Sequence, residues 1–200
     1  MYFMIKIVNR LLYFLFTSPF YKLTLGSIGK GTKLRKAELT GSKRIFIGSG
    51  VYINKFTWLA CSPLTGDAAC KLLIGDGTYI GRFGHIYATS GIEIGKKVLI
   101  ADKVYISDNL HGYQQIDVAI IDQTIIQANK VFIGDGAWLG ENVCVIGASV
   151  GKNSVIGANS LVNKNIPDYC VAAGAPAVII KRYKFETNCW QKTDKAGQFI

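Results

Sequence analysis

The sequence predicts an all-β fold in which short strands form the edges of a stacked, three-sided coil. Aliphatic residues recur every six positions in two series, Ile133, Leu139 and Val145 followed by Val150, Ile156 and Val162. A glycine comes directly after four of them, at Gly134, Gly140, Gly151 and Gly157. A period of six fits neither the 3.6-residue turn of a helix nor the alternation of a strand, so it indicates a structural repeat.

Each repeat is expected to make one short edge of the coil. Its aliphatic side chain points inward, and the small residue occupies the corner, where a larger side chain would clash. Three edges close a coil of about 18 residues, and stacked coils bury an aliphatic column that one coil cannot bury alone. Twenty-two glycines against four prolines fit a fold made of corners.

The same pattern defines the extent of the predicted coils. It runs at Ile74, Ile80, Ile86 and Ile92, shifts by two residues to Ile94, Ile100 and Ile106, and is fainter from Ile28 to Leu59. We therefore expect coils over residues 26–166, with irregular first turns, because terminal repeats are commonly atypical. Two segments break the pattern, a predicted loop over residues 61–71 and an insertion over residues 107–130. Residues 167–200 are expected to form a C-terminal cap and a tail that is loosely ordered from Glu186.

Residues 1–25 are expected to form an amphipathic N-terminal helix. Polar side chains recur at helical spacing opposite a broad apolar face, at Lys6, Asn9, Arg10, Tyr13 and Thr17. The longest unbroken hydrophobic run, residues 11–16, is far shorter than the roughly 20 residues of a spanning helix. Two interpretations stay open, a helix packed on the prism or on a neighbouring subunit, and a helix lying in the plane of a membrane.

Composition narrows the number of domains, the kind of partner and the kinds of cysteine site that are expected. Two hundred residues suffice for one domain with a sizeable core. Twenty-three lysines and arginines against 13 acidic residues give a net charge of +10, which favours an anionic partner such as nucleic acid, anionic lipid or a phosphorylated cofactor. Five cysteines without a C-x-x-C pair indicate neither a disulfide framework nor a zinc ribbon, so buried free thiols are expected.

Four segments carry a resemblance to a known family. The insertion contains DNLHGY at residues 108–113, and the later coils contain IGDGAWLG at 133–140, IGANSLVNKNIP at 156–167 and AGAPA at 173–177. The last three resemble the G-D-x-x-W-[IL]-G, I-G-A-x-S-V-V-x-K-x-I-P and A-G-x-P-A segments of the hexapeptide-repeat acyltransferases. The D-x-x-H-G-Y form is similar to the sugar O-acetyltransferases of surface-polysaccharide pathways. The resemblance spans roughly residues 74–182.

The resemblance implies a fold and a catalytic residue. The fold is a left-handed parallel β-helix, an exception to the usual right-handed crossover. His111, near the start of the insertion, corresponds to the family's general base. An imidazole with a pKa of about 6.5 can accept the proton of a sugar hydroxyl and return it to the departing thiolate.

The resemblance also implies that the last coils bind coenzyme A, with acetyl-CoA as the acyl donor. Small residues leave backbone groups open to the pantetheine amides, and basic side chains reach the phosphates. The candidate residues are Trp138, Gly140, Ala158, Lys164, Ala175, Lys181 and Arg182. Trp138 equally fits a wall between subunits, and Arg182 equally fits a solvated basic tail.

Candidates for acceptor contact are His85, Asp108, Asn109 and Tyr113. Asp108 could hold one ring nitrogen of His111, although the interpretation as a turn former is slightly favoured. His85 lies within the repeat pattern, where a histidine is more often a stacked or exposed wall residue, so it is expected to be structural or to contact the acceptor. A zinc site with three histidine ligands needs more than the two histidines present, and no metal is expected.

The resemblance implies a homotrimeric acetyl-CoA-dependent O-acetyltransferase that acts on a sugar in capsule, O-antigen or exopolysaccharide synthesis, and this is the predicted function. Flat prism walls can pack around a three-fold axis and form each active site between two chains. The enzyme is expected in the cytoplasm, with peripheral contact at the inner face of the membrane as an open alternative, and no nucleic acid is expected as partner. Alternative functions are acetylation of an amino sugar, serine or an antibiotic, and a non-catalytic β-helix scaffold.

Overall fold

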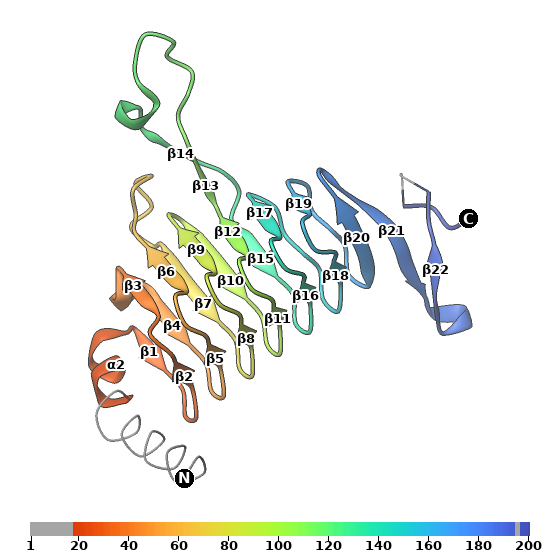
Figure 1. Ribbon diagram of the computed structural model, residues 1–200, viewed down its shortest axis with the longest axis horizontal. Helices are drawn as coiled ribbons and strands as arrows, with labels where there is room; N and C mark the ends of the chain where they lie inside the picture. The colour runs from red at the N-terminus through yellow and green to blue at the C-terminus, as the bar shows by residue number, and fades with distance from the viewer. Residues whose placement is uncertain (1–17, 195–196) are drawn as a thin grey trace.

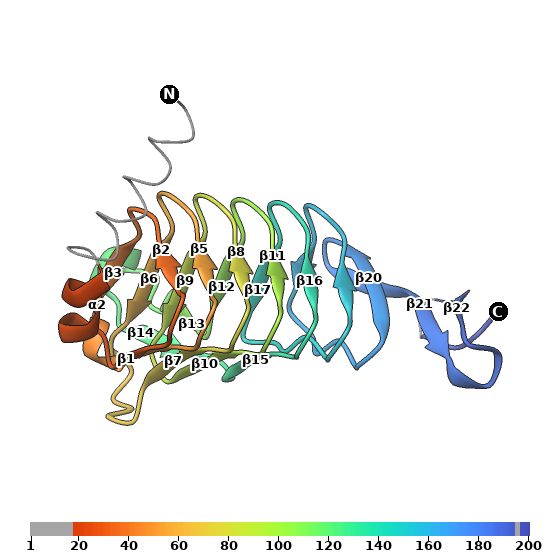
Figure 2. The same ribbon diagram turned by 90° about the horizontal axis from the view of Figure 1, so that it is seen from below.

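Three parallel sheets form the faces of a long prism in the computed structural model of the chain (Figures 1 and 2). The structure describes residues 18–194 and 197–200. The expected N-terminal helix therefore falls largely outside the described residues. Within them, no helix is both long enough and apolar enough to cross a membrane.

The first five coils each contribute one strand to each face, and the later coils continue sheet A only through the isolated bridges of Val150 and Ile166. Sheet A contains β1 (Ser27–Ile28), β4 (Ile45–Ile47), β7 (Lys71–Ile74), β10 (Gly91–Ile94) and β15 (Val131–Ile133). Sheet B begins with β2 (Lys33–Leu34), β5 (Tyr52–Ile53), β8 (Tyr79–Ile80), β11 (Leu99–Ile100), β16 (Trp138–Leu139) and β18 (Val155–Ile156), and continues with β20 (Cys170–Gly174), β21 (Ala177–Lys184) and β22 (Cys189–Lys192). Sheet C contains β3 (Glu38–Thr40), β6 (Trp58–Cys61), β9 (His85–Ala88), β12 (Tyr105–Ser107), β17 (Cys144–Ile146) and β19 (Leu161–Val162).

The aliphatic residues of the six-residue pattern form the buried core, as the sequence predicts. Ile80, Ile100 and Leu139 align through the parallel pairing of β8, β11 and β16, and all three are fully buried. The same alignment repeats on the other two faces, so each coil adds one layer to three aliphatic columns. Burial of one such side chain contributes about 1.5–3 kcal/mol. This confirms the prediction of a mostly β, repeat-built parallel β-helix.

Corners are fixed by backbone hydrogen bonds to aspartates of the next coil. The Oδ1 atoms of Asp76, Asp135 and Asp168 each accept a backbone N–H from the preceding coil, at 2.7 Å. Gly75 precedes one of these aspartates, and a Cβ there would lie 2.6 Å from the backbone of Gly95. The corner glycines therefore allow the 4.7–4.9 Å strand spacing that stacked coils need.

Both breaks in the pattern leave the prism at the end of sheet C. The first, residues 62–70, follows β6, and the second follows β12. The second forms an antiparallel hairpin of β13 (Asn109–His111) and β14 (Ile125–Gln127), with the 3₁₀ turn η3 (Ile120–Asp122) beyond it. Figure 1 shows this hairpin standing off the prism.

The two ends of the prism differ. At the N-terminal end, α2 (Ser18–Thr24) and the following residue bury Tyr21 and Leu25 in the core cluster, and the 3₁₀ turn η2 (Ser42–Arg44) lies beside it. At the C-terminal end, β21 pairs antiparallel with β20 and with β22, and extends beyond the coils (Figure 2). The loosely ordered tail expected from Glu186 is therefore wrong for residues 186–192, which contain the end of η4 (Phe185–Thr187) and all of β22.

Candidate active site

His111 lies on the last residue of β13, on the hairpin that leaves the prism. It pairs with Ile125 of β14, and the next residue continues the pairing through the bond from Gly112 N to Thr124 O, at 3.0 Å. The side chain is exposed, and within the described residues neither ring nitrogen has a hydrogen-bond partner. His111 is thus held by backbone pairing while its imidazole stays open to a substrate. Tyr113, two residues further on, is 67% exposed.

Asp108 occupies the point where the hairpin leaves the prism, and it is fully buried. Its Oδ1 accepts hydrogen bonds from the backbone N–H and the hydroxyl of Thr89, at 2.8 and 3.0 Å. Its Oδ2 accepts the backbone N–H groups of Ser90 and Gly91, at 2.8 and 2.7 Å. The carboxylate therefore fastens the hairpin to the corner of the preceding coil.

These contacts correct the two functional roles expected for Asp108. Its oxygens face the backbone of residues 89–91, so it neither orients His111 nor reaches an acceptor. Asp108 is a structural residue, but it bonds across coils and is not the local turn former that the sequence slightly favoured. Asn109 is also buried, and its Nδ2 donates to the backbone oxygen of Tyr87 at 3.2 Å. The Asn109 amide nitrogen is therefore occupied, and acceptor contact by Asn109 stays a prediction.

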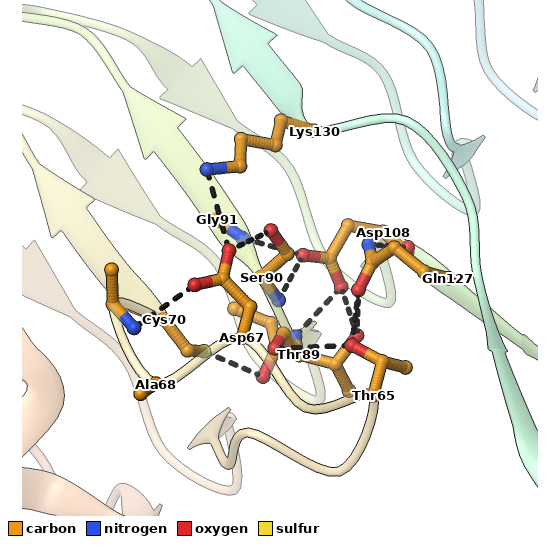
Figure 3. A network of polar contacts seen from close by, with 12 residues as sticks. Thr65, Asp67, Ala68, Cys70, Thr89, Ser90, Gly91, Asp108, Gln127 and Lys130 are labelled. Atoms are coloured by element: carbon orange, nitrogen blue, oxygen red, sulfur yellow. Dashed lines mark hydrogen bonds and ion pairs between the residues drawn. The ribbon is translucent and has the colours of Figure 1, made fainter.

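Gln127, at the end of β14, ties the returning strand of the hairpin to the same corner (Figure 3). Its Nε2 donates to the backbone oxygen of Asp108 at 2.6 Å, and its Oε1 accepts from the hydroxyls of Thr65 and Thr89, at 2.5 and 3.0 Å. Thr65 belongs to the 62–70 loop, so the two insertions are joined through one side chain.

Asp67 completes this network from the same loop. Its Oδ2 accepts from the Ser90 hydroxyl at 2.5 Å and forms an ion pair with Lys130 at 3.4 Å (Figure 3). The hydrogen bond to Ser90 is the main reason that the pKa of Asp67 lies below its ordinary value. The base of the hairpin, at Asp108 and residues 127–130, is thus bonded to the corners of the two preceding coils, at residues 65–67 and 89–91. Sequence reasoning missed Thr65, Asp67, Gln127 and Lys130, because none belongs to a repeat or a recognised segment.

His85 lies on the outer face of sheet C, away from the exposed part of the hairpin. Its ring stacks on Trp58 with centroids 4.4 Å apart, and Tyr105 meets it edge-on at 5.1 Å. Its Nε2 is buried without a hydrogen-bond partner, and burial lowers the pKa of the imidazole. This placement favours the interpretation of His85 as a stacked wall residue.

Several residues expected to bind coenzyme A gather on sheet B and at the corner that follows it. Trp138 of β16 is 48% exposed and aligns through Val155 and Val171 with Lys181 of β21. Small residues lie at the adjoining corner, where a Cβ on Gly140 would meet the backbone of Ala158 at 2.7 Å. Ala175, beside the turn between β20 and β21, extends this stripe. Ala158 and Ala175 are exposed.

Two other predicted residues lie apart from this stripe. Lys164 follows β19, so this strand of sheet C lies between Lys164 and Ala158. Lys164 therefore lies at the edge of the prism from which the hairpin also leaves. Arg182 turns to the C-terminal tail, donating to the Gly197 backbone oxygen at 3.3 Å and lying 5.7 Å from the Phe199 ring centroid. Arg182 is thus occupied by packing.

Two grooves of the described chain lie on and beside sheet A. One of about 640 Å³ runs along the outer face of sheet A, between Phe46, Glu93 and Phe132. A second, of about 260 Å³, adjoins Ser90 and Lys130. No predicted site residue lines either of these two grooves.

The five cysteines of the described residues are free thiols. Cys61, Cys70 and Cys170 are buried free thiols, and burial raises the pKa of each, whereas Cys189 is exposed. In the described part of the chain, no three histidine, cysteine or acidic side chains gather as a metal site.

Comparison with known proteins finds the same repeat and relatives that are named as acetyltransferases. Residues 130–164 match the family model described as "Hexapeptide repeat of succinyl-transferase". The chain is 38% identical over 128 residues to an Escherichia coli K12 protein provisionally named as a lipopolysaccharide biosynthesis O-acetyl transferase, WbbJ, covering 60% of this chain and 65% of that protein. It is 34% identical over 179 residues to a Mycobacterium tuberculosis protein provisionally named as an acetyltransferase, covering 82% and 59%. The chain thus spans less than two thirds of the length of each.

Solved structures show the same fold. AntD, an N-acyltransferase from Bacillus cereus, aligns with a TM-score of 0.70 at 21% identity, over 85% of this chain and 90% of that one. A maltose O-acetyltransferase from Clostridium difficile 630 aligns with a TM-score of 0.57 at 25% identity, over 84% and 74%. At 21% identity, the likeness to AntD concerns the fold alone.

Proposed function

Because the chain belongs to the hexapeptide-repeat acyltransferase family, we propose that it is an acetyl-CoA-dependent O-acetyltransferase acting on a sugar hydroxyl of a surface glycan. The observation that carries the proposal is His111, exposed on a hairpin whose base is fixed by buried hydrogen bonds. A scaffold would need neither an open imidazole nor the small-residue stripe at the end of sheet B. The relative that is provisionally named as a lipopolysaccharide biosynthesis O-acetyl transferase supports a sugar acceptor.

His111 acts as the general base. A ring nitrogen accepts the proton of the acceptor hydroxyl as its oxygen attacks the thioester carbonyl carbon. When the carbon–sulfur bond breaks, the imidazolium returns that proton to the departing thiolate sulfur, so the histidine is regenerated. The open imidazole suits this role because, among the residues that the structure describes, no side chain bonds to its nitrogens.

The donor lies along the stripe of Trp138, Gly140, Ala158 and Ala175, with Lys181 at its cationic end. Small side chains leave room for the narrow pantetheine arm, and an ammonium group suits its phosphates. Lys164 lies at the other edge of sheet C, beside the hairpin base.

This separation supports a homotrimer with active sites between subunits. His111 and the donor stripe lie on different edges of one prism, so a complete site needs His111 from one chain and the stripe from its neighbour. The proposal further includes left-handed winding of the coils, a C-terminal cap made by β20–β22 and a cytoplasmic location where acetyl-CoA is available. The amphipathic helix over residues 1–25 stays a prediction.

The test is an acetyl-transfer assay on purified protein, with release of free coenzyme A followed across sugar nucleotides, glycan fragments and amino sugars. His111→Ala should lower turnover by about two to four powers of ten while circular dichroism stays unchanged. His85→Phe, which keeps the stacked ring, is the matched control and should retain most of the activity. Transfer by His111→Ala at the unmodified rate would refute this role, and transfer to amines alone would reassign the acceptor.

A further inference from the structure

Positive charge is concentrated at one end of the molecule. Residues 18–55 hold eight lysines and arginines and one acidic residue, Glu38. The eight are Lys22, Lys30, Lys33, Arg35, Lys36, Lys43, Arg44 and Lys55. Residues 56–200 hold thirteen basic and twelve acidic residues, so they are nearly neutral. The basic segment builds α2 and the first coils, which form the N-terminal end of the prism in Figure 1.

These cations are not neutralised within the described part of the chain. The ion pairs there are Lys103–Glu141 and Lys130–Asp67, both outside residues 18–55. Where the basic side chains of this end do bond, they donate to neutral oxygens, as Arg35 does to the Tyr52 hydroxyl at 3.0 Å. The positive charges of these lysine and arginine side chains can therefore attract an anionic partner.

Apolar side chains project from the same end. While Tyr21 and Leu25 cover the core, Phe20 and Leu23 on the other side of α2 are 59% and 75% exposed, and Lys22 between them is exposed. Aromatic and aliphatic groups flanked by lysines are typical of elements that enter the headgroup layer of a membrane.

We propose that this N-terminal pole, formed by α2 and the first coil (residues 18–44), docks on a membrane surface of anionic lipid. The cations attract the lipid phosphates, and Phe20 and Leu23 insert between headgroups. Nucleic acid would use the charge but gives no reason to expose these two apolar side chains. In a trimer with a three-fold axis along the prisms, the three poles would face the same surface and bind together. This inference does not depend on acyl transfer.

The charge is tested by flotation of the full chain with vesicles of 30% phosphatidylserine in phosphatidylcholine. Lys30→Glu/Lys36→Glu should weaken partition at least about 25-fold, since each cation near an anionic surface contributes about fivefold. The matched control is Lys96→Glu/Lys97→Glu, which changes the net charge equally. Lys30 and Lys96 occupy the same corner of different coils, and Lys36 and Lys97 both have positive φ, 47° and 53°.

The apolar contact is tested by Leu23→Ser, which should weaken binding to the same vesicles while thermal stability is retained, because this side chain is largely exposed. Pure phosphatidylcholine vesicles should bind the unmodified chain poorly, and salt should release it from the anionic ones. The proposal is overturned if both double variants lose partition equally or if the unmodified chain stays unbound at low salt. It is also overturned if duplex DNA binds more tightly than vesicles and Leu23→Ser leaves vesicle binding unchanged.

Discussion

At the scale of single residues, Asp108 and His111 have opposite environments although they are three positions apart. Asp108 is fully buried with five donors around its two oxygens, and His111 is exposed with its ring nitrogens open. An unpaired buried carboxylate is costly, so the donors of residues 89–91 account for the burial of Asp108. One residue fixes the hairpin, and the other is free to react.

His85 gives a prediction about stability and pH. Burial lowers the pKa of its imidazole below the unfolded value of about 6.5, so the unfolded chain binds the proton more readily. The contribution of His85 to stability is therefore complete above the unfolded pKa and is lost as the pH falls below it. His85→Phe keeps the stack on Trp58 and removes the titration. Its Tm should fall less between pH 7.5 and 5.5 than that of the unmodified protein, and equal falls would contradict this account.

At the scale of elements, the β13–β14 hairpin depends on contacts at its base for the position of His111. Besides its own backbone pairing, it is held by Asp108 on the outgoing strand and by Gln127 on the returning strand. Gln127 also bonds to Thr65 of the neighbouring insertion. Gln127 is therefore a positioning residue.

Gln127→Leu should lower kcat about tenfold to a hundredfold with a smaller change in KM for acetyl-CoA, because a misplacement of about 1 Å can cost that much in rate. Gln123→Leu, whose side chain bonds only near the tip of the hairpin, should have a smaller effect. Steady-state kinetics and the pH profile of kcat decide the matter, together with a thermal melt that checks folding. An unaltered kcat in Gln127→Leu would show that the base does not position His111.

At the scale of the whole molecule, a single prism separates the two halves of the proposed site. The hairpin leaves the end of sheet C that lies next to sheet A, and the donor stripe lies on sheet B and at its corner with sheet C. Assembly would bring one half from each of two chains together. The sheet faces that would meet carry half-buried aromatic side chains such as Trp58 and Tyr105.

Two inactive variants should therefore complement each other. His111→Ala removes the base, and Ala158→Trp fills the donor stripe, so each homotrimer should be inactive. In trimers mixed at random from equal amounts, about a quarter of the interfaces hold both intact halves, and about that share of activity should return. Activity of the co-expressed pair is compared with that of the two proteins purified separately and combined without subunit exchange. No recovery in stable mixed trimers would place the site within one chain.

The amino-acid sequence by itself determined the β-helix core, because the repeat is local. Each six-residue unit fixes one edge, and stacking then aligns Ile80, Ile100 and Leu139 without information from distant parts of the chain. It also determined which segments leave the prism, since Cys61–Lys71 and Ser107–Lys130 interrupt the spacing, and it selected His111 as the candidate base.

Tertiary structure decided what those segments do. The burial of Asp108 and Asn109, and the bonds from Gln127 to Thr65 and Thr89, depend on two insertions meeting at one corner of successive coils. The repeat does not predict these contacts, because the six-residue spacing does not continue into the insertions. The separation of His111 from the donor stripe likewise follows from which corner of a three-sided coil each residue occupies, and that is a property of the closed prism.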